Sequence, residues 1–372
     1  MQEGGFNSHK LKKNNKGEQV TLIITRVTCV LIKMFGKKPK ESIGLDIGNH
    51  YVKICELTQK QGKYYLSAFG IEHLDNDSQE AKVTAIKKLA RESGITSNKV
   101  NISVCGPLVI VRYILLPSMT RQQLESAIKF EAEKYIPFNI EEVTLNAPIL
   151  EEKREDGKIR VLIVAAKKSF IEDYVKLVES CGLEPQLIDV DSFALINSFL
   201  LNNPDKQDQG IIALLHIGAN FTNINILKDG VSHFMRDITI GGRDLTKIIA
   251  EKLNMDYASA ENVKCNPQTR QEEIFSIITP ALNNLLGEIS LSFSYYEDQL
   301  ERGIDKVFLS GGTSKLKDLD KFLSSNLGMD IVSWDPVLKL QVNPALNQER
   351  LKSCLPMLSV GMGLALSSPE KT

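Results

Sequence analysis

Two short stretches of this chain carry residues whose types and spacing suit the binding of phosphate. "GLDIGNHYVKICEL" runs from Gly44 to Leu57, and "LLHIGANFTNINIL" runs from Leu214 to Leu227. Each reads as a strand, a glycine turn and a second strand. Such a turn directs several backbone N–H groups into one concavity, and a concavity of this kind binds anions. Glycine is needed there because a Cβ would collide with a phosphate that approaches the backbone closely.

The two stretches share Leu-x-Ile-Gly and differ at the second position, which is Asp46 in the first and His216 in the second. A carboxylate just before the turn is placed to hold Mg²⁺ through water, because that ion keeps several waters. An imidazole is no hard oxygen ligand, but it can donate a hydrogen bond to a phosphate oxygen, more strongly when protonated. A core histidine bonded to neighbouring backbone is the alternative for His216, and a surface lysine on an edge strand is the alternative for Lys53.

A third glycine turn occurs in "LSGGTSKL", where Gly311 and Gly312 stand between a strand and a helix. A helix N-terminus at this point can take a nucleoside or its α-phosphate. One glycine hairpin is a weak signal, whereas two at the starts of similar halves, followed by this turn, indicate a clamp for a polyphosphate. Asp189 and Asp191 are candidates to orient water, and Asp191 is the candidate catalytic residue.

The composition is that of a soluble globular chain of two or three domains. The chain has 372 residues, of which 42% are hydrophobic and 24% are charged. A formal net charge of −1 argues against nucleic acid as a partner, because a whole-protein nucleic-acid footprint would be strongly basic. The six cysteines are far apart and form no CxxC, so we expect reduced thiols in a cytoplasmic protein.

The first residues have a composition of their own, with nine Lys or Arg and two Glu in residues 1–40. They contain "VTLIITRVTCVLIKMF", whose sixteen residues fall short of the ~20 that a membrane-spanning helix needs. We expect residues 1–41 to be a disordered extension; a basic amphipathic membrane anchor is the alternative. Met34 opens "MFGKKPKES" just before the first strand and is an alternative natural start. No other segment approaches a transmembrane helix.

The first half reads as strands from Ser42 onward and a helix from Gln79 to Ser93. "VNISVCGPLVIVRYILLP" then predicts two strands that end at Pro117. After these strands the period changes to that of helices. Thr120 and Gln123 form a capping box, and Pro137 ends the helix that this box opens. A hairpin that turns at Asp156-Gly157 and a helix over residues 169–180 follow, which indicates a self-contained α+β unit.

The second half continues with a strand, a double-glycine turn and a helix in "RDITIGGRDLTKIIAEKLN". The longest helix is predicted to start at Pro280, because apolar residues recur there with a 3.6-residue period. We expect a hinge over residues 202–210. The predicted boundaries are a first lobe over 42–117, 185–207 and 350–367, an inserted α+β subdomain over 118–184, and a second lobe over 208–349.

This layout resembles the actin-like ATPase fold, an α/β fold of two duplicated lobes that each open with a phosphate hairpin. On that resemblance, the site residues fall into four groups. The first phosphate motif comprises Asp46, Gly48, Asn49, His50 and Lys53; the second comprises His216, Gly218, Ala219, Asn220 and Thr222; the adenosine motif comprises Gly311, Gly312 and Thr313; and the nucleotide-side loop and helix comprise Gly242, Asp244, Glu261 and Lys264. The resemblance implies ATP and Mg²⁺ as ligands, with Asp46 holding the metal through water.

The inserted α+β unit narrows the resemblance to the branch of FtsA and PilM. "RQQLESAIKFEAEKYIPFNIEEVTLNAPIL" and "MRDITIGGRDLT" are similar to the type IV pilus assembly protein PilM, over Phe35–Ser367. PilM-like proteins are cytoplasmic and bind ATP, and a groove between their first subdomain and the inserted one holds the N-terminal cytoplasmic tail of inner-membrane PilN. They join the alignment complex that links the pilus motor to the secretin, in twitching motility and competence. PilO, the motor ATPases and a second copy are further partners that the resemblance implies.

The resemblance therefore predicts a peptide-binding scaffold at the inner membrane more than a catalyst. His216 stands where the family usually has Asp, which lowers our expectation of efficient ATP hydrolysis. An FtsA-like, filament-forming membrane adaptor is one alternative, although the chain ends "LALSSPEKT" without an amphipathic helix. A small-molecule kinase of the same superfamily is the other.

Overall fold

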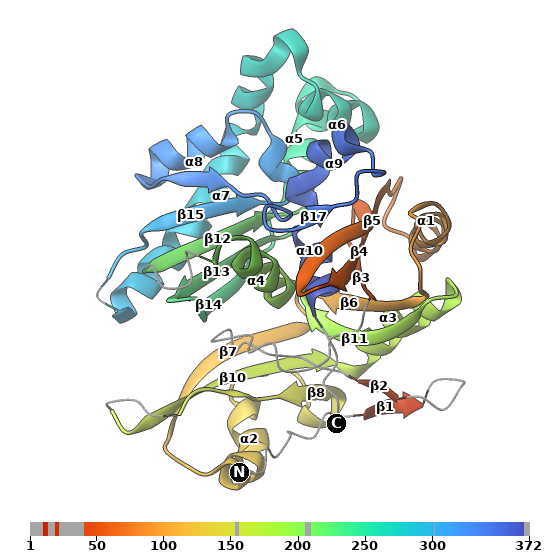
Figure 1. The fold of residues 1–372 in the computed structure, drawn as a ribbon. Coiled ribbons are helices and arrows are strands. Elements are labelled where there is room, and N and C mark those ends of the chain that lie inside the picture. The colour runs from red at the N-terminus through yellow and green to blue at the C-terminus, as the bar shows by residue number, and fades with distance from the viewer. Residues whose placement is uncertain are drawn as a thin grey trace. The chain divides into compact units, whose positions relative to one another are not determined.

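The computed structural model describes residues 10–13, 19–21, 41–152, 156–204, 210–300 and 302–367 (Figure 1). These residues divide into two compact units. Unit 1 contains those up to Asn203, Val337–Ser353 and those from Val360 onward, and unit 2 contains Pro204–Pro336 and Cys354–Ser359. Met34 and residues 205–209 of the predicted hinge lie outside the described residues.

Unit 1 is built on a sheet with the strand order β1-β2-β11-β6-β3-β4-β5-β17. The strands are β1 (Lys10–Lys13), β2 (Gln19–Thr21), β3 (Glu41–Ile47), β4 (Tyr51–Lys60), β5 (Lys63–His73), β6 (Lys99–Val104), β11 (Glu184–Val190) and β17 (Gln341–Val342). The helices of this unit outside its insertion are α1 (Gln79–Glu92), α3 (Lys168–Ser180), α4 (Asp191–Asn202), α9 (Gln348–Cys354) and α10 (Ser359–Leu366).

Glycines let α10 approach its neighbours without an intervening layer of side chains. A Cβ added to Gly44 of β3 would lie 2.1 Å from the Gly361 carbonyl oxygen. One added to Gly363 would lie 1.7 Å from the carbonyl oxygen of Ala194 in α4. The apolar run near the C-terminus therefore serves as an internal helix of unit 1.

The insertion in unit 1 has its own sheet, with the order β7-β10-β8 and β9 paired to β10. Its elements are β7 (Val109–Pro117), α2 (Arg121–Glu133), the 3₁₀ turn η1 (Ile140–Glu142), β8 (Val143–Asn146), β9 (Ile149–Glu151) and β10 (Lys158–Lys167). The predicted capping box is confirmed, since Thr120 and Gln123 bond reciprocally at the start of α2. The helix α2 lies against this sheet (Figure 1), and its residues Leu124 and Ile128 belong to one core cluster with residues of the strands.

Unit 2 has a five-stranded sheet with the order β14-β13-β12-β15-β16. The strands are β12 (Ile211–Ile217), β13 (Thr222–Lys228), β14 (Val231–Ile238), β15 (Lys306–Ser310) and β16 (Ile331–Ser333). The helices are α5 (Gly242–Leu253), α6 (Tyr257–Cys265), α7 (Gln271–Leu300) and α8 (Leu319–Leu327), with 3₁₀ turns η3 (Gln268–Arg270), η4 (Gly312–Lys315) and η5 (Leu355–Met357).

The two units repeat one strand arrangement. In unit 1, β5, β4 and β3 form an antiparallel meander that continues through parallel pairs to β6 and β11. In unit 2, β14, β13 and β12 form the same meander, which continues through parallel pairs to β15 and β16. The hairpin registers agree as well, because Ile47 pairs with Val52 and Ile217 pairs with Thr222 across turns of equal length.

The helix α7 corrects two sequence predictions. It begins at Gln271, nine residues before the predicted start, and Pro280 lies inside it. Ile274 and Ile278 belong to the same core cluster as the later apolar residues, so the buried stripe continues through the proline. By length and composition this helix could cross a membrane, contrary to the expectation that no further segment approaches one. Its buried face packs in the core of unit 2, as the face of an internal helix does.

Three predicted domains also need new bounds. Residues 10–13 and 19–21 form an antiparallel strand pair, and β2 pairs in parallel with β11, so the part of the extension that is described here is not a disordered tail. The insertion begins before residue 118, because β7 pairs along its length with β10, and it ends before α3, because α3 contacts α1 and β11 and contributes no residue to the core of the insertion. Residues 337–349 belong to unit 1 rather than to the second lobe, because β17 pairs with β5.

Candidate functional site

Three glycine turns of unit 2 meet at the tip of the β12–β13 hairpin. The carbonyl oxygen of Gly218 accepts hydrogen bonds from the Gly242 N–H at 3.0 Å and from the Thr313 Oγ1 at 2.9 Å. The carbonyl oxygen of Ala219 accepts the Arg243 N–H at 2.9 Å. The first N–H groups of α5 thus fix the hairpin tip in place.

The close approach of these turns requires glycine. A Cβ on Gly241 would lie 2.4 Å from the Ala219 carbonyl oxygen, and one on Gly242 would lie 2.4 Å from Thr313 Oγ1. Gly311 has φ +94°, and its Cβ would lie 2.3 Å from the carbonyl oxygen of Ile217. Gly312, by comparison, is exposed. Sequence reasoning named Gly242, Gly311 and Gly312 and missed Gly241.

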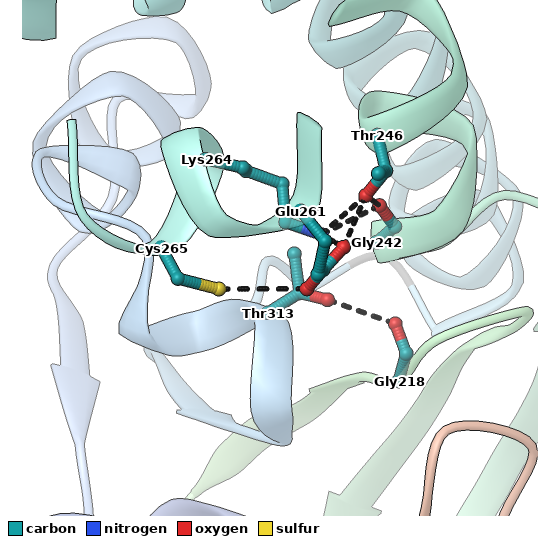
Figure 2. Close-up of polar contacts among 7 residues, drawn as sticks. All are labelled: Gly218, Gly242, Thr246, Glu261, Lys264, Cys265 and Thr313. Carbon is teal, nitrogen blue, oxygen red and sulfur yellow. Dashed lines mark hydrogen bonds and ion pairs between the residues drawn. The ribbon is translucent and has the colours of Figure 1, made fainter. Parts of the chain in front are cut away.

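Lys264 of α6 is the centre of a buried polar cluster beside these turns (Figure 2). Its Nζ donates to the Gly242 carbonyl oxygen at 2.9 Å, to Thr246 Oγ1 at 2.7 Å and to Glu261 Oε2 at 2.7 Å. Thr246 also donates to the Glu261 carboxylate. An ammonium group has three N–H donors, so this one is saturated by the protein. Lys264 and Glu261, both predicted site residues, therefore hold α5 and α6 together at the site.

The Glu261 carboxylate also accepts a hydrogen bond from Cys265 Sγ at 3.4 Å (Figure 2). Burial raises the pKa of the Cys265 thiol, and the charge of Glu261 raises it further. The thiol therefore stays protonated, which makes it a weak nucleophile.

A cavity of about 180 Å³ adjoins this cluster within unit 2. Apolar side chains and two amides line it together with three lysines: Pro267, Ile274, Phe275, Leu316, Gln268, Gln271, Lys264, Lys315 and Lys317, with Cys265 completing the wall. Gln271 Nε2 donates to Asp318 Oδ2 at 2.9 Å. Apolar side chains together with amides and cations suit an aromatic base next to phosphate. The sequence did not indicate the cavity residues between Pro267 and Phe275, because they belong to no motif. The positive φ angle of Gln268, +49°, is likewise visible only in the structure.

The other predicted residues of the second hairpin have various roles. Thr222 is fully buried and donates to the Ile240 carbonyl oxygen at 2.8 Å, so it anchors the loop before α5. Asp244 accepts the Gly241 N–H at 2.9 Å. His216 is half-buried, and its Nδ1 lies 3.0 Å from Ser310 Oγ. Asn220 lies at the tip.

The first hairpin, in unit 1, holds an ion pair at its base. Lys53 Nζ lies 3.0 Å from Asp46 Oδ2, with exposed side-chain fractions of 14% and 9%. The Gly48 N–H donates to the Tyr51 carbonyl oxygen at 3.2 Å and closes the turn. Asn49 Nδ2 donates to Asp77 Oδ2 at 2.9 Å. The rings of His50 and His73 meet edge to face at 4.6 Å.

The two acidic candidates beyond the hairpins differ in their surroundings. Asp191 is the half-buried first residue of α4. Asp189 is 5% exposed and accepts the N–H of Val190 at 2.8 Å, with Ser367 Oγ at 3.5 Å. Burial, assisted by the nearby charge of Asp191, raises the pKa of Asp189 to about 7. Asp189 is thus an internal carboxyl group of unit 1.

Taken separately, the residues of each unit suit a part of a magnesium nucleotide. Among the described residues, Asn220 Oδ1 is a buried polar atom with no protein partner at the hairpin tip, where a ligand hydroxyl or bound water would satisfy it. Asp46 offers a hard carboxylate oxygen of the kind that Mg²⁺ prefers, and Lys53 beside it offers a cation for phosphate. A bound nucleotide with its metal would supply a reactive phosphoanhydride. The protein would supply the backbone and side-chain groups that bind it.

The repeated sheet order and the glycine turns define the class of this protein as the actin-like ATPase fold. The ethanolamine utilization protein EutJ from Carboxydothermus hydrogenoformans has this fold and matches with a TM-score of 0.51 and 15% identity, over 89% of this chain and 90% of that chain.

A family model described as "Type IV pilus assembly protein PilM" matches residues 44–369, and the chain belongs to this family. A solved PilM-PilN type IV pilus biogenesis complex matches with a TM-score of 0.79 and 28% identity, over 88% of this chain and 98% of that chain.

Cell division protein FtsA from Staphylococcus epidermidis is 32% identical over 111 residues, which is 30% of this chain. The match spans 23% of the length of that relative. The similarity to FtsA is thus confined to a part of each protein. The role of the chain in type IV pilus assembly follows from its membership of the PilM family.

Proposed function

We propose that this chain is an ATP-binding cytoplasmic scaffold of the type IV pilus machine that recognises the N-terminal cytoplasmic tail of the inner-membrane protein PilN. The observation that carries the proposal is the similarity to a PilM-PilN complex over 88% of this chain and 98% of that chain. Through PilN the scaffold would stand at the inner membrane, linked to PilO and in reach of the motor ATPases. Unit 1 with its inserted subdomain is the proposed peptide-binding part.

The proposed nucleotide-binding residues are those of the glycine turns and the hairpins. The Gly218–Asn220 tip and the Gly311–Thr313 turn would face the phosphates and the nucleoside, and the cavity beside Lys264 would take the base. Asp46 would hold the hydrated magnesium ion and Lys53 would balance the phosphate charge. Asp191 is the proposed residue for orienting water.

A peptide copied from the PilN tail is expected to bind the purified chain, and ATP is expected to change its affinity. The measurement is fluorescence anisotropy of the labelled peptide, with and without ATP and Mg²⁺. A scrambled peptide of the same composition is the control, because a groove for an extended segment distinguishes side-chain order. If neither condition gives more binding than the scrambled peptide, the scaffold proposal fails.

His216→Asp is expected to raise ATP turnover by about tenfold. The substitution gives the second hairpin the carboxylate that the first has at Asp46, in the same register position, and one well-placed charge changes a rate by roughly this factor or more. The measurement is phosphate release at saturating ATP. His216→Asn, which is polar without the charge, is the control; equal turnover in both variants would contradict this explanation of the histidine.

An FtsA-like filament is the second candidate, favoured by the identity of 32% with FtsA over 111 residues. Sedimentation of the chain as polymers in the presence of ATP and Mg²⁺ would favour it over the scaffold.

A further inference from the structure

Among the described residues that line the cavity beside Lys264, every charged side chain is a lysine. The lining includes Lys264, Lys315 and Lys317, and it includes no carboxylate. Lys264 is saturated by its three acceptors. Lys315 and Lys317 are exposed, and within the described part of the chain neither has a hydrogen bond or an ion pair. Their N–H donors are therefore available to a ligand in the cavity.

The two carboxylates next to the lining are engaged by other groups. The Glu261 carboxylate accepts hydrogen bonds from three side chains of its own cluster. Asp318 accepts from Gln271 Nε2 at 2.9 Å and from Lys321 Nζ at 2.7 Å. The side chains that line the cavity thus offer more hydrogen-bond donors than acceptors, because a lysine ammonium group only donates.

A single short turn connects the cavity to the proposed phosphate site. The 3₁₀ turn η4 begins at Gly312, and its Thr313 Oγ1 donates to the Gly218 carbonyl oxygen at 2.9 Å (Figure 2). The same turn ends at Lys315, which lines the cavity. With the phosphates of a nucleotide at the hairpin tip and its base in the cavity, Lys315 and Lys317 would face the base.

Purine bases differ in what they offer to such donors. Hypoxanthine and guanine carry a keto oxygen at position 6 beside the ring nitrogen N7, and both atoms accept hydrogen bonds. Adenine has an amino group at position 6, so an ammonium group that approaches N7 meets another donor there. In protein–DNA interfaces lysine is accordingly a partner of guanine, whereas adenine pairs with the amide of asparagine or glutamine.

We propose that Lys315 and Lys317 select the base of the bound nucleotide, so that the cavity takes a 6-keto purine in preference to adenine. This inference rests on the proposed nucleotide binding and names the base that the site prefers. ATP remains a ligand, because the glycine turns bind phosphates whatever the base. Guanine and hypoxanthine should bind equally well, since they differ by a 2-amino group and none of the described lining residues is a carboxylate that would accept from it.

The test is calorimetric titration of the full chain with ATP, ITP and GTP in the presence of Mg²⁺. ATP and ITP differ only in the amino or keto group at position 6 and in the proton on N1. The ratio of their affinities therefore reports how the site treats the keto oxygen. We expect ITP and GTP to bind at least about fivefold more tightly than ATP, the lower end of what one good base contact contributes.

The joint substitution Lys315→Gln with Lys317→Gln should bring the affinities for ATP and ITP within about twofold of each other. An amide accepts from the adenine amino group as readily as it donates to a keto oxygen. Lys252→Gln, at an exposed lysine of α5 that does not line the cavity, is the control and should leave the ratio at its original value. Circular dichroism checks that each variant is folded.

The outcomes separate this inference from the proposal on which it rests. If none of the three triphosphates binds the unchanged chain, nucleotide binding itself fails. If ATP binds as tightly as ITP, or if the preference for ITP survives the joint substitution, nucleotide binding stands and the selection by the two lysines is overturned. Lysines that only attract phosphates would give the second of these results, because their loss would weaken all three nucleotides by one factor. A preference that disappears with Lys315 and Lys317 and persists in Lys252→Gln supports the inference.

Discussion

Gly241→Ala is expected to lower the affinity for ATP by about a hundredfold, which corresponds to roughly 2.7 kcal/mol. The new methyl group would lie 2.4 Å from the carbonyl oxygen of Ala219 and 2.9 Å from the N–H nitrogen of Asn220. Both are backbone atoms of the hairpin tip, so no side chain can rotate away to relieve the contact. The tip must move by about 1 Å to reach ordinary contact distance, which would displace the backbone N–H groups that we propose for phosphate binding.

The matched control is Gly287→Ala in the middle of α7, where an added Cβ meets nothing within 4 Å. Alanine is the better helix former by about 1 kcal/mol, so this variant should be slightly more stable and bind ATP normally. Calorimetric titration gives both affinities, and circular dichroism reports whether Gly241→Ala remains folded. A folded Gly241→Ala protein that binds ATP within threefold of the unchanged chain would contradict the placement of the nucleotide at this tip.

The duplicated hairpins could be predicted from the sequence because each hairpin is a local structure. Alternating apolar residues around a glycine turn determine strand, turn and register within a dozen residues, and the registers of Ile47–Val52 and Ile217–Thr222 agree accordingly. The capping box at Thr120 is local as well. Predictions of this kind are confirmed by the structure.

Boundaries that depend on distant pairing were not available from the sequence. β7 follows β6 in the sequence with only a short connection, yet it pairs with β10, about 50 residues further on. β17 has two residues and no pattern of its own, and its place is decided by β5. The β-branched Val20 and Thr21 favour a strand, but the place of that strand in the sheet is decided by its pairing with β1 and with the edge of β11.

For the candidate site, the sequence indicated which residue types take part, but it did not show which atoms they contact. The spacing of Glu261 and Lys264 predicts that they lie on one face of α6. It does not predict that three acceptors bind the lysine ammonium group. The sequence alone does not distinguish the roles of Gly241 and Gly242. Only the structure shows that a Cβ on Gly241 would meet the backbone of the hairpin tip.

Asp189 leads to the second large expected effect, on stability rather than on binding. This carboxyl group of unit 1 is 5% exposed, and burial raises its pKa from 3.8 to about 7, against the opposing hydrogen bonds from Val190 and Ser367. The folded protein therefore keeps this proton between about pH 4 and pH 7, whereas the unfolded chain releases it. Stability falls as the pH rises through that window, and the full penalty applies above pH 7.

Asp189→Asn removes this penalty because an amide has the same shape and does not ionise. One pKa unit is worth about 1.4 kcal/mol, so the advantage of the variant in free energy of unfolding should grow by on the order of 3 kcal/mol between pH 5 and pH 8. Its Oδ1 can still accept the N–H of Val190, which preserves the local backbone bond. Urea unfolding of both proteins at pH 5, 6, 7 and 8 measures the difference.

Asp229→Asn, at an exposed turn residue with φ +50° that asparagine tolerates, is the control and should give a difference that is constant with pH. The growth of the difference is the decisive quantity, because any effect of the amide on packing is the same at every pH and cancels. A constant difference for Asp189→Asn would mean that the carboxyl ionises in the folded protein at its ordinary pKa. Unit 1 would then have to carry a buried negative charge at the end of β11, next to the first turn of α4. In that case Asp189 would return as a candidate for orienting water, together with Asp191.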